Sequence, residues 1–250
     1  MQALLLAGAR GSSPLVEELG LTNKSLIPIH GKPMIQYVLE ELNCVKGIKK
    51  ITVVGPPEEL KKIKTAVPFS IVPEKGEIME NMLEGFRSFS TADAGPTFIL
   101  TSDIPLITCK SLEDFIERSL ETQADFCYPV IEKEVCEKKY SGVVRTYVRL
   151  KEGLFTGGNI FLIDSAIVER TAKKAISFLA LRKKPHLMAV KLGLPFIVKF
   201  IFKKVSLEDA ERRASIIFGV KGKAIISPYA EIGFDVDKVS DLHLAEEYLK

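Results

Sequence analysis

The first residues that could do chemistry are two glycines and a lysine near the start of the chain. An apolar run over residues 3–7 leads into Gly8 and Gly11, and Lys24 follows before a second apolar stretch. A glycine loop after a strand lets backbone N–H groups close around a phosphate, and a nearby lysine can neutralise the same phosphate. The spacing is neither G-x-G-x-x-G nor a P-loop, because Pro33 stands where a P-loop has Ser or Thr. The pattern therefore indicates phosphate binding outside those two motifs.

An aspartate follows another apolar run. Residues 97–100 are expected to form a strand, and Asp103 comes just after it, held by Pro105. Mg²⁺ prefers hard oxygen ligands, usually one or two carboxylates together with the phosphates of the substrate. Asp103 is therefore a candidate metal ligand, and the alternative is that it only caps a helix.

These motifs resemble those of the MobA-like nucleotidyltransferases, the group similar to the molybdenum-cofactor nucleotidyltransferase. The resemblance implies a GT-A-like fold and an enzyme that transfers NMP from an NTP to a phosphorylated small-molecule acceptor. Pyrophosphate would be released, with Mg²⁺ or Mn²⁺ as cofactor and molybdenum-cofactor biosynthesis as one setting. The stretches that carry the resemblance are Leu6-Ala7-Gly8, Asn23-Lys24-Ser25-Leu26 and Gly31-Lys32-Pro33. The nucleotide-binding residues it implies are Leu6, Ala7, Gly8, Gly11, Lys24 and Asn81.

The resemblance also assigns roles further along the chain. It implies that Asp103 and Asp237 hold the metal, with Asp235 as a substitute for the second ligand. Asn81 falls at a polar position that contacts the nucleotide, where an amide can donate and accept; the alternative is a polar surface residue on a helix. The acceptor-side element, which could instead be a β-bulge or turn, comprises Gly157, Gly158 and Asn159.

One position departs from the family pattern. The family has an arginine that steadies the triphosphate where this chain has Ser13, and Arg10 lies three residues earlier. We expect Arg10 to supply that charge, so the expected catalytic residues are Arg10, Lys24 and Asp103. If Arg10 does not supply the charge, the alternatives are a slow enzyme, an enzyme for an unusual nucleotide, or a non-catalytic nucleotide-binding protein. A nucleotide-sugar-dependent glycosyltransferase would share the same fold.

Strand and helix signals alternate along the chain. This predicts an α/β fold with a doubly wound, mostly parallel, Rossmann-like sheet and helices on both faces. Ligands of such sheets bind beyond the carboxyl ends of the strands, where Gly8, Asn81 and Asp103 would meet. The expected strands cover residues 3–7, 50–54, 69–72, 96–100, 125–130, 143–150, 158–163 and 223–227. The expected helices cover residues 33–43, 58–65, 77–88, 111–121, with Ser111 as cap, and 239–249.

A basic helical lobe interrupts this pattern. We expect a single domain over residues 1–250, with a core at 1–165 and 220–250 and the lobe at 166–219. The ordinary expectation is that the lobe packs its apolar face on the core or on a second subunit. The alternative is weak peripheral membrane binding, or selection of a lipid-like phosphorylated acceptor. An apolar segment at 192–202 is flanked by Lys183, Lys184, Lys203 and Lys204.

Composition sets the remaining limits. The chain has 250 residues, of which 46% are hydrophobic, and this is enough for one large core. Its net charge of +3 is below that of a dedicated nucleic-acid binder, so no nucleic-acid partner is expected. Four cysteines without a C-x-x-C pair suit a reducing compartment. No stretch reaches the ~18 apolar residues of a membrane span, and no signal peptide is recognisable. We expect a cytoplasmic protein, either monomeric or a homodimer.

Overall fold

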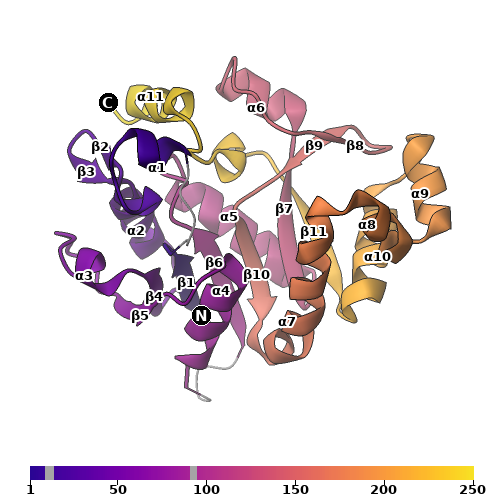
Figure 1. Ribbon diagram of the computed structural model, residues 1–250, viewed down its shortest axis with the longest axis horizontal. Helices are drawn as coiled ribbons and strands as arrows, with labels where there is room; N and C mark the ends of the chain where they lie inside the picture. The colour runs from indigo at the N-terminus through magenta and orange to yellow at the C-terminus, as the bar shows by residue number, and fades with distance from the viewer. Residues whose placement is uncertain (9–13, 91–94) are drawn as a thin grey trace.

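The computed structural model of the chain describes residues 1–8, 14–90 and 95–250, without the side chains of residues 179, 182, 183 and 185. At its centre lies a nine-stranded sheet with helices on both faces (Figure 1). A separate two-stranded sheet joins β2 (Pro28–Ile29) to β3 (Lys32–Pro33).

The sheet is mixed, and most of its strands share one direction. Strands β1 and β4, β1 and β6, β4 and β5, and β7 and β11 pair in parallel. Strand β10 lies between β6 and β7 and is antiparallel to both, and β9 is antiparallel to β7 and β8. The expected α/β architecture with a mostly parallel sheet is confirmed. In spatial order the strands are β5 (Ser70–Pro73), β4 (Lys50–Gly55), β1 (Gln2–Leu6), β6 (Pro96–Thr101), β10 (Ile160–Asp164), β7 (Phe126–Glu132), β9 (Leu154–Gly157) and β8 (Val148–Arg149), with β11 (Gly222–Ser227) beside β7.

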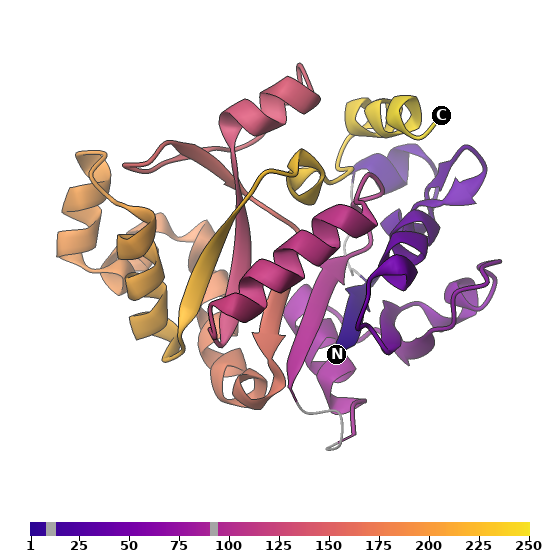
Figure 2. The same cartoon turned by 180° about the vertical axis from the view of Figure 1, so that it is seen from behind.

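Helices form a layer on each face of the sheet. Helices α4 (Ile78–Arg87) and α7 (Ser165–Leu179) contact each other on one face. Helices α2 (Met34–Cys44) and α5 (Cys109–Glu121) contact each other on the other face, where α5 crosses the sheet in the view from behind (Figure 2). The remaining α-helices are α1 (Pro14–Glu18), α3 (Pro57–Leu60), α6 (Lys133–Lys139), α8 (Pro185–Leu192), α9 (Leu194–Ile201), α10 (Leu207–Phe218) and α11 (Val239–Tyr248).

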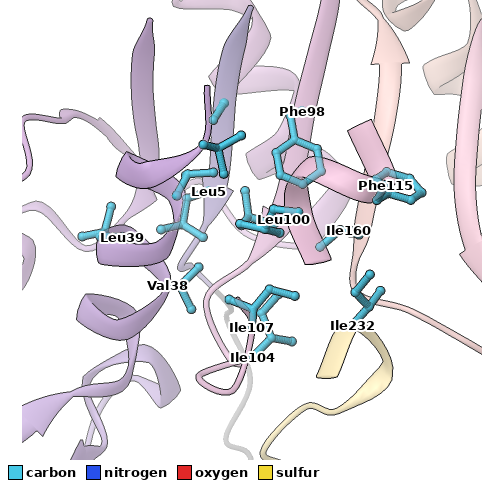
Figure 3. Close-up of a cluster of buried hydrophobic side chains, with 14 of the residues drawn as sticks. Leu5, Val38, Leu39, Phe98, Leu100, Ile104, Ile107, Phe115, Ile160 and Ile232 are labelled. Atoms are coloured by element: carbon cyan, nitrogen blue, oxygen red, sulfur yellow. The ribbon is translucent and has the colours of Figure 1, made fainter. Parts of the chain in front are cut away.

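Burial on both faces explains the apolar character of the central strands. Successive side chains of a strand point to opposite faces, so Leu5 packs in the cluster that includes α2 and α5, whereas Leu4 and Leu6 pack in the cluster that includes α7. Figure 3 shows the first of these clusters, in which Phe98 of β6 lies with its ring centroid 6.1 Å from that of Phe115 of α5. A strand buried on both sides reads as a continuous apolar run, which is why β1 is readable from sequence.

Three local expectations are wrong. The helix expected over residues 58–65 is the short α3, which ends at Leu60. Residues 143–150 were expected to form a strand, but only β8 forms there, and β9 is the longer strand of this region. Val144 is 79% exposed, so its side chain gains no burial that would stabilise a strand in this segment. Helix α5 is capped by Thr108 rather than by Ser111, since the Thr108 hydroxyl accepts a hydrogen bond from the Ser111 N–H at 3.2 Å.

The segment expected as a helical lobe is helical from α7 to α10, with a 3-10 turn, η3 (Ala180–Lys183), between α7 and α8. Helix α7 lies on the sheet, whereas α8, α9 and α10 lie together at one end of the molecule, orange at the right of Figure 1. Across the described ranges 1–8, 14–90 and 95–250, no helix has the length and apolar content needed to cross a membrane.

Candidate active site

Three carboxylates meet beyond the carboxyl end of β6. Asp103 lies two residues after β6, and Asp235 and Asp237 lie in the segment between the 3-10 turn η4 (Ala230–Gly233) and α11. One oxygen from each of the three lies within 4.8 Å of the others. The Val236 N–H donates to the Asp103 carbonyl at 2.9 Å and so ties the two segments together. The fold therefore brings together acids that are more than 130 positions apart in the sequence.

Lys24 lies inside this acid cluster. Its ammonium donates to Asp103 Oδ2 at 2.6 Å and also to Asp237 Oδ1. Its side chain is only 18% exposed. Burial acts to lower the pKa of Lys24, but the two carboxylates outweigh it and the net shift of the pKa is upward. Sequence reasoning expected Lys24 at the phosphates, and the structure places its charge on the acids.

Arg145 holds the third carboxylate. It forms an ion pair with the Asp235 carboxylate, and its Nη2 donates to the Asp235 carbonyl at 2.8 Å. Burial raises the pKa of Asp235 to about 6; Arg145 opposes this shift, and Asp103 and Asp237 add to it. Burial also acts to raise the pKa of Asp237, but the hydrogen bond from Lys24 leads to a net lowering. Sequence analysis did not single out Arg145, since no local pattern marks a cation that reaches its partner through the fold.

The Asn-Lys-Ser motif positions Lys24 at the end of β1. The Asn23 amide donates to the Ala7 carbonyl at 2.8 Å, and the Ser25 hydroxyl donates to the same carbonyl at 3.1 Å. The Asn23 side chain also accepts from the Ser25 N–H at 2.8 Å, an Asx turn that starts the 3-10 turn η1 (Lys24–Leu26). These bonds hold the lysine beside the strand from which the glycine loop begins.

The structure shows a reason for Gly8 that sequence reasoning did not use. A methyl group added at Gly8 would lie 2.3 Å from Glu74 Oε2 and 2.7 Å from Glu74 Cβ, so only glycine fits there. Of the loop residues expected to bind the triphosphate, Arg10 and Gly11 lie outside the described residues, as does Ser13. Leu6 and Ala7 are buried, so their side chains offer nothing to a ligand in solvent at the loop.

Asn81 occupies a different environment from the expected one. It is fully buried, and its amide nitrogen donates to the carbonyls of Gly8 at 3.0 Å and Gly76 at 3.1 Å. Its oxygen accepts from the N–H groups of Lys75 at 2.8 Å and Gly76 at 3.3 Å. An amide has two donors and two acceptor positions, so these four bonds leave none for a nucleotide in this arrangement. Asn81 holds the start of the glycine loop against α4.

The Gly-Gly-Asn element adjoins the acid cluster. The Asn159 N–H donates to the Ile232 carbonyl at 3.0 Å, and the Asn159 carbonyl accepts from the Thr101 N–H at 3.1 Å. The Thr101 hydroxyl in turn donates to Asp103 Oδ1 at 2.5 Å. A methyl group at Gly158 would lie 2.6 Å from Ile232, so this glycine permits the close approach of η4. The element thus links both segments that carry the acids.

The three carboxylates fit a divalent metal of the magnesium type. They supply hard oxygens, the ligands that Mg²⁺ and Mn²⁺ prefer. The ammonium of Lys24 already places one positive charge between Asp103 and Asp237. Sequence analysis named Asp235 only as a substitute for the second metal ligand. The structure places it in the same cluster as Asp103 and Asp237.

The chain is similar to several known proteins. A family model described as the MobA-like NTP transferase domain matches residues 3–192. The chain is 26% identical to an 8-amino-3,8-dideoxy-manno-octulosonate cytidylyltransferase of a Shewanella species, over 100% of this chain and 99% of that protein. It is 28% identical to a probable molybdenum cofactor guanylyltransferase of Thermococcus kodakarensis, over 52% of this chain and 59% of that one. Among solved structures, a hypothetical transferase from Thermus thermophilus superposes with a TM-score of 0.83 at 32% identity, covering 96% of this chain and 98% of that chain.

Proposed function

The chain belongs to the MobA-like NTP transferase domain family, and we propose that it transfers NMP from an NTP to a phosphorylated small-molecule acceptor with release of pyrophosphate. Nucleotidyl transfer is the activity named for both curated relatives, a cytidylyltransferase and a guanylyltransferase. The protein is thus a nucleotidyltransferase, as its sequence led us to expect. These relatives favour nucleotidyl transfer over the nucleotide-sugar-dependent glycosyltransferase that the fold also allowed.

The observation that carries the residue assignment is the meeting of Lys24 with Asp103 and Asp237 beside the glycine loop. We assign Asp103 and Asp237 as the residues that hold Mg²⁺, with Asp235 beside them and oriented by Arg145. Mg²⁺ bound there would neutralise charge on the phosphates and act as a Lewis acid.

Lys24 serves the phosphates in this proposal. An ammonium has three donors, so it can keep an ion pair with one carboxylate while it donates to a phosphate oxygen. The raised pKa of Lys24, which its two carboxylates cause against the effect of burial, keeps it charged at neutral pH. The backbone N–H of Gly8 and the guanidinium group of Arg10 complete the proposed triphosphate site. The role of Arg10 is assigned from sequence alone. Asn81 acts as a positioning residue, because its hydrogen bonds hold Gly8.

The chemical step requires no nucleophile from the protein. An oxygen of the acceptor phosphate attacks the α-phosphorus of the NTP, the bond from that phosphorus to the α–β bridging oxygen breaks, and pyrophosphate leaves. Because the acceptor oxygen is already anionic at neutral pH, no general base is needed. Catalysis then depends on holding the two phosphates in line and neutralising their charges. We assign the acceptor side to Gly157, Gly158 and Asn159, which lie against the acid cluster.

A thermal-shift panel of the four NTPs, each with and without Mg²⁺, tests the binding half of this proposal. A ligand at 100 times its Kd adds about 2.7 kcal/mol to the free energy of unfolding, so the preferred base is expected to stand out. Pyrophosphate release with the preferred NTP and a set of phosphorylated acceptors tests the transfer. Nucleotide binding without release of pyrophosphate from the NTP, whichever acceptor is present, would instead support the non-catalytic nucleotide-binding protein.

A further inference from the structure

A large apolar cavity lies on the face of the sheet that α4 and α7 cover. Its volume is about 370 Å³, within the range of small-molecule sites in proteins. None of its lining residues is charged, and Tyr128 and Thr171 carry the only hydroxyl groups. The Thr171 hydroxyl donates to the Ile167 carbonyl of its own helix at 2.8 Å, so it is not offered to the cavity. Protein interiors are otherwise close-packed, and a void of this size forgoes many van der Waals contacts.

One end of the cavity reaches the active site. The Tyr128 ring forms part of its wall and stacks on Phe161, with centroids 6.1 Å apart. The Tyr128 hydroxyl lies against the acceptor-side glycines, because a methyl group added at Gly157 would lie 1.9 Å from it. Tyr128 therefore borders both the apolar cavity and the acceptor-side glycines.

A second wall residue leads to the same place. Leu6 lines the cavity and is the last residue of β1, two positions before Gly8. It pairs in register with Thr101 of β6, whose hydroxyl donates to Asp103. A ligand in the cavity would thus have one end beside both the glycine loop and the acids.

The other end of the cavity lies beneath the helical lobe. Phe178 near the end of α7 and Phe218 at the end of α10 both line it, and their rings meet edge to face with centroids 5.4 Å apart. Between these two residues the chain forms α8 and α9, which expose large apolar side chains; Val190 is 77% exposed and Leu194 is 75% exposed. Residues 170–207 contain ten Lys and Arg residues and no Asp or Glu. Exposed apolar side chains among cations are typical of a surface that contacts anionic lipid.

We propose that the acceptor is a lipid monophosphate, with its hydrocarbon chain in this cavity and its phosphate at the site where Asp103, Asp235 and Asp237 would hold Mg²⁺. This inference rests on the proposed nucleotidyl transfer and names the class of acceptor for it. An uncharged cavity next to a phosphate-handling site matches a ligand with an anionic head and an apolar tail. Each methylene that leaves water for such a cavity is expected to raise affinity roughly fourfold. The product would be a nucleotide joined through a diphosphate to a lipid.

The test compares dodecyl phosphate with hexyl phosphate, both below their micelle concentrations, in titration calorimetry with the full chain in the presence of Mg²⁺. We expect dodecyl phosphate to bind at least about 100-fold more tightly, because six more methylenes can enter the cavity. Ala172, a buried wall residue of α7, provides the probe: Ala172→Phe fills the cavity and is expected to remove the preference for the longer chain. Ala175→Leu is a smaller filling on the same wall, for use if the first variant does not fold. Ala166→Phe, on the exposed side of the same helix, is the matched control and is expected to keep the preference.

Titration of the preferred NTP with Mg²⁺, run on each variant, separates the two proposals. If the parent binds NTP but prefers neither alkyl phosphate, the lipid acceptor is wrong and the proposed nucleotidyl transfer stands. If the chain-length preference survives in the folded filling variants, the cavity is not the chain site and the inference is also overturned. If the parent binds no NTP, the proposed function itself fails, whatever the alkyl phosphates do.

Discussion

The ammonium of Lys24 lies 2.6 Å from the carboxylate of Asp103, although the two residues are 79 positions apart. The same ammonium also meets Asp237, so one cation offsets two of the three clustered acids. Lys24 and the two acids that we propose as metal ligands are therefore one electrostatic unit before any substrate arrives. Loss of one charge in this unit is expected to change how the protein responds to metal and to nucleotide.

Lys24→Met removes the ammonium and keeps much of the side-chain volume. We expect it to lower the free energy of unfolding by roughly 1–2 kcal/mol in EDTA, less than the 3–5 kcal/mol of a fully buried pair, because these side chains keep contact with water. Mg²⁺ is expected to restore that loss, because it replaces the missing positive charge among the acids. Thermal unfolding with EDTA and with Mg²⁺ measures both effects.

The matched control is Lys32→Met, which breaks the partly exposed ion pair, 2.7 Å long, between Lys32 of β3 and Glu40 of α2. It is expected to show no gain in its response to Mg²⁺. An equal Mg²⁺ shift in Lys24→Met and in the parent would contradict the assignment of the acids as a metal site.

Asp103→Asn keeps the shape of the side chain but removes an anionic ligand. We expect turnover to fall roughly 100-fold or more, since metal-assisted charge stabilisation supplies several kcal/mol and each 1.36 kcal/mol is tenfold in rate. Circular dichroism is expected to show a native fold, because the Asn oxygen can still accept from Thr101. Asp114→Asn on α5, away from the site, serves as the control. Unchanged Mg²⁺-dependent turnover in Asp103→Asn would remove this residue from the metal site.

Asn81→Leu tests whether this residue positions the loop or contacts the nucleotide. It leaves the backbone groups of Gly8, Lys75 and Gly76 without their partner inside the protein, and we expect the free energy of unfolding to drop by about 2–3 kcal/mol without nucleotide. Gln36→Leu on α2, at a partly exposed amide, is expected to stay within roughly 0.5 kcal/mol. Full stability together with lost NTP binding would restore the direct contact expected from sequence.

Arg10→Ala is expected to lower kcat/KM roughly 10- to 100-fold, the value of one charge-assisted hydrogen bond to the triphosphate. Ser13→Ala is expected to have little effect, and Ser13→Arg, which installs the residue of the family pattern, is expected to raise the rate. Steady-state kinetics of pyrophosphate release compares the three variants. Equal and small effects of both alanine substitutions would show that the loop needs no guanidinium group.

Flotation with vesicles of phosphatidylcholine and phosphatidylglycerol tests the exposed lobe surface. We expect the parent to float at low salt and less so at about 0.15 M, where charges are screened beyond about 8 Å. Replacing the exposed Lys184, Lys203 and Lys204 with Gln is expected to release the protein. Lys183, the fourth lysine that flanks the segment, has a side chain outside the described part of the structure.

The control for flotation replaces three exposed lysines that follow α3, at the opposite end of the molecule from the lobe (Figure 1): Lys61, Lys62 and Lys64. Loss of the same number of charges there is expected to leave flotation unchanged. A parent that never floats, and that sediments as a dimer through α8 and α9, would assign the lobe surface to a subunit interface instead.

The sequence by itself determined the elements whose signals are local. The run that forms β1 is apolar from Ala3 to Leu6 because both faces of that strand are buried. In α2 the apolar residues recur with the helical period because only one face of the helix is buried. The positions of Gly8 and Asp103 just after apolar strands were enough to predict where ligands bind, because parallel strands end at a common edge. The resemblance to the MobA-like family indicated Asp237 as the second metal ligand, with Asp235 as its substitute.

Only the tertiary structure decided which distant groups meet. Strand β10 lies antiparallel between β6 and β7, a pairing set by long-range packing rather than by the alternation that marks a strand. Arg145 comes from a segment whose pattern predicted a strand, yet it reaches Asp235. Asn81 was expected to contact the nucleotide or to lie on the surface of a helix. Its burial depends on β1 and the residues after β5 approaching α4. Strand and helix patterns in a sequence relate residues two to four positions apart. The charge balance among Lys24 and the acids depends instead on segments that only the folded chain brings together.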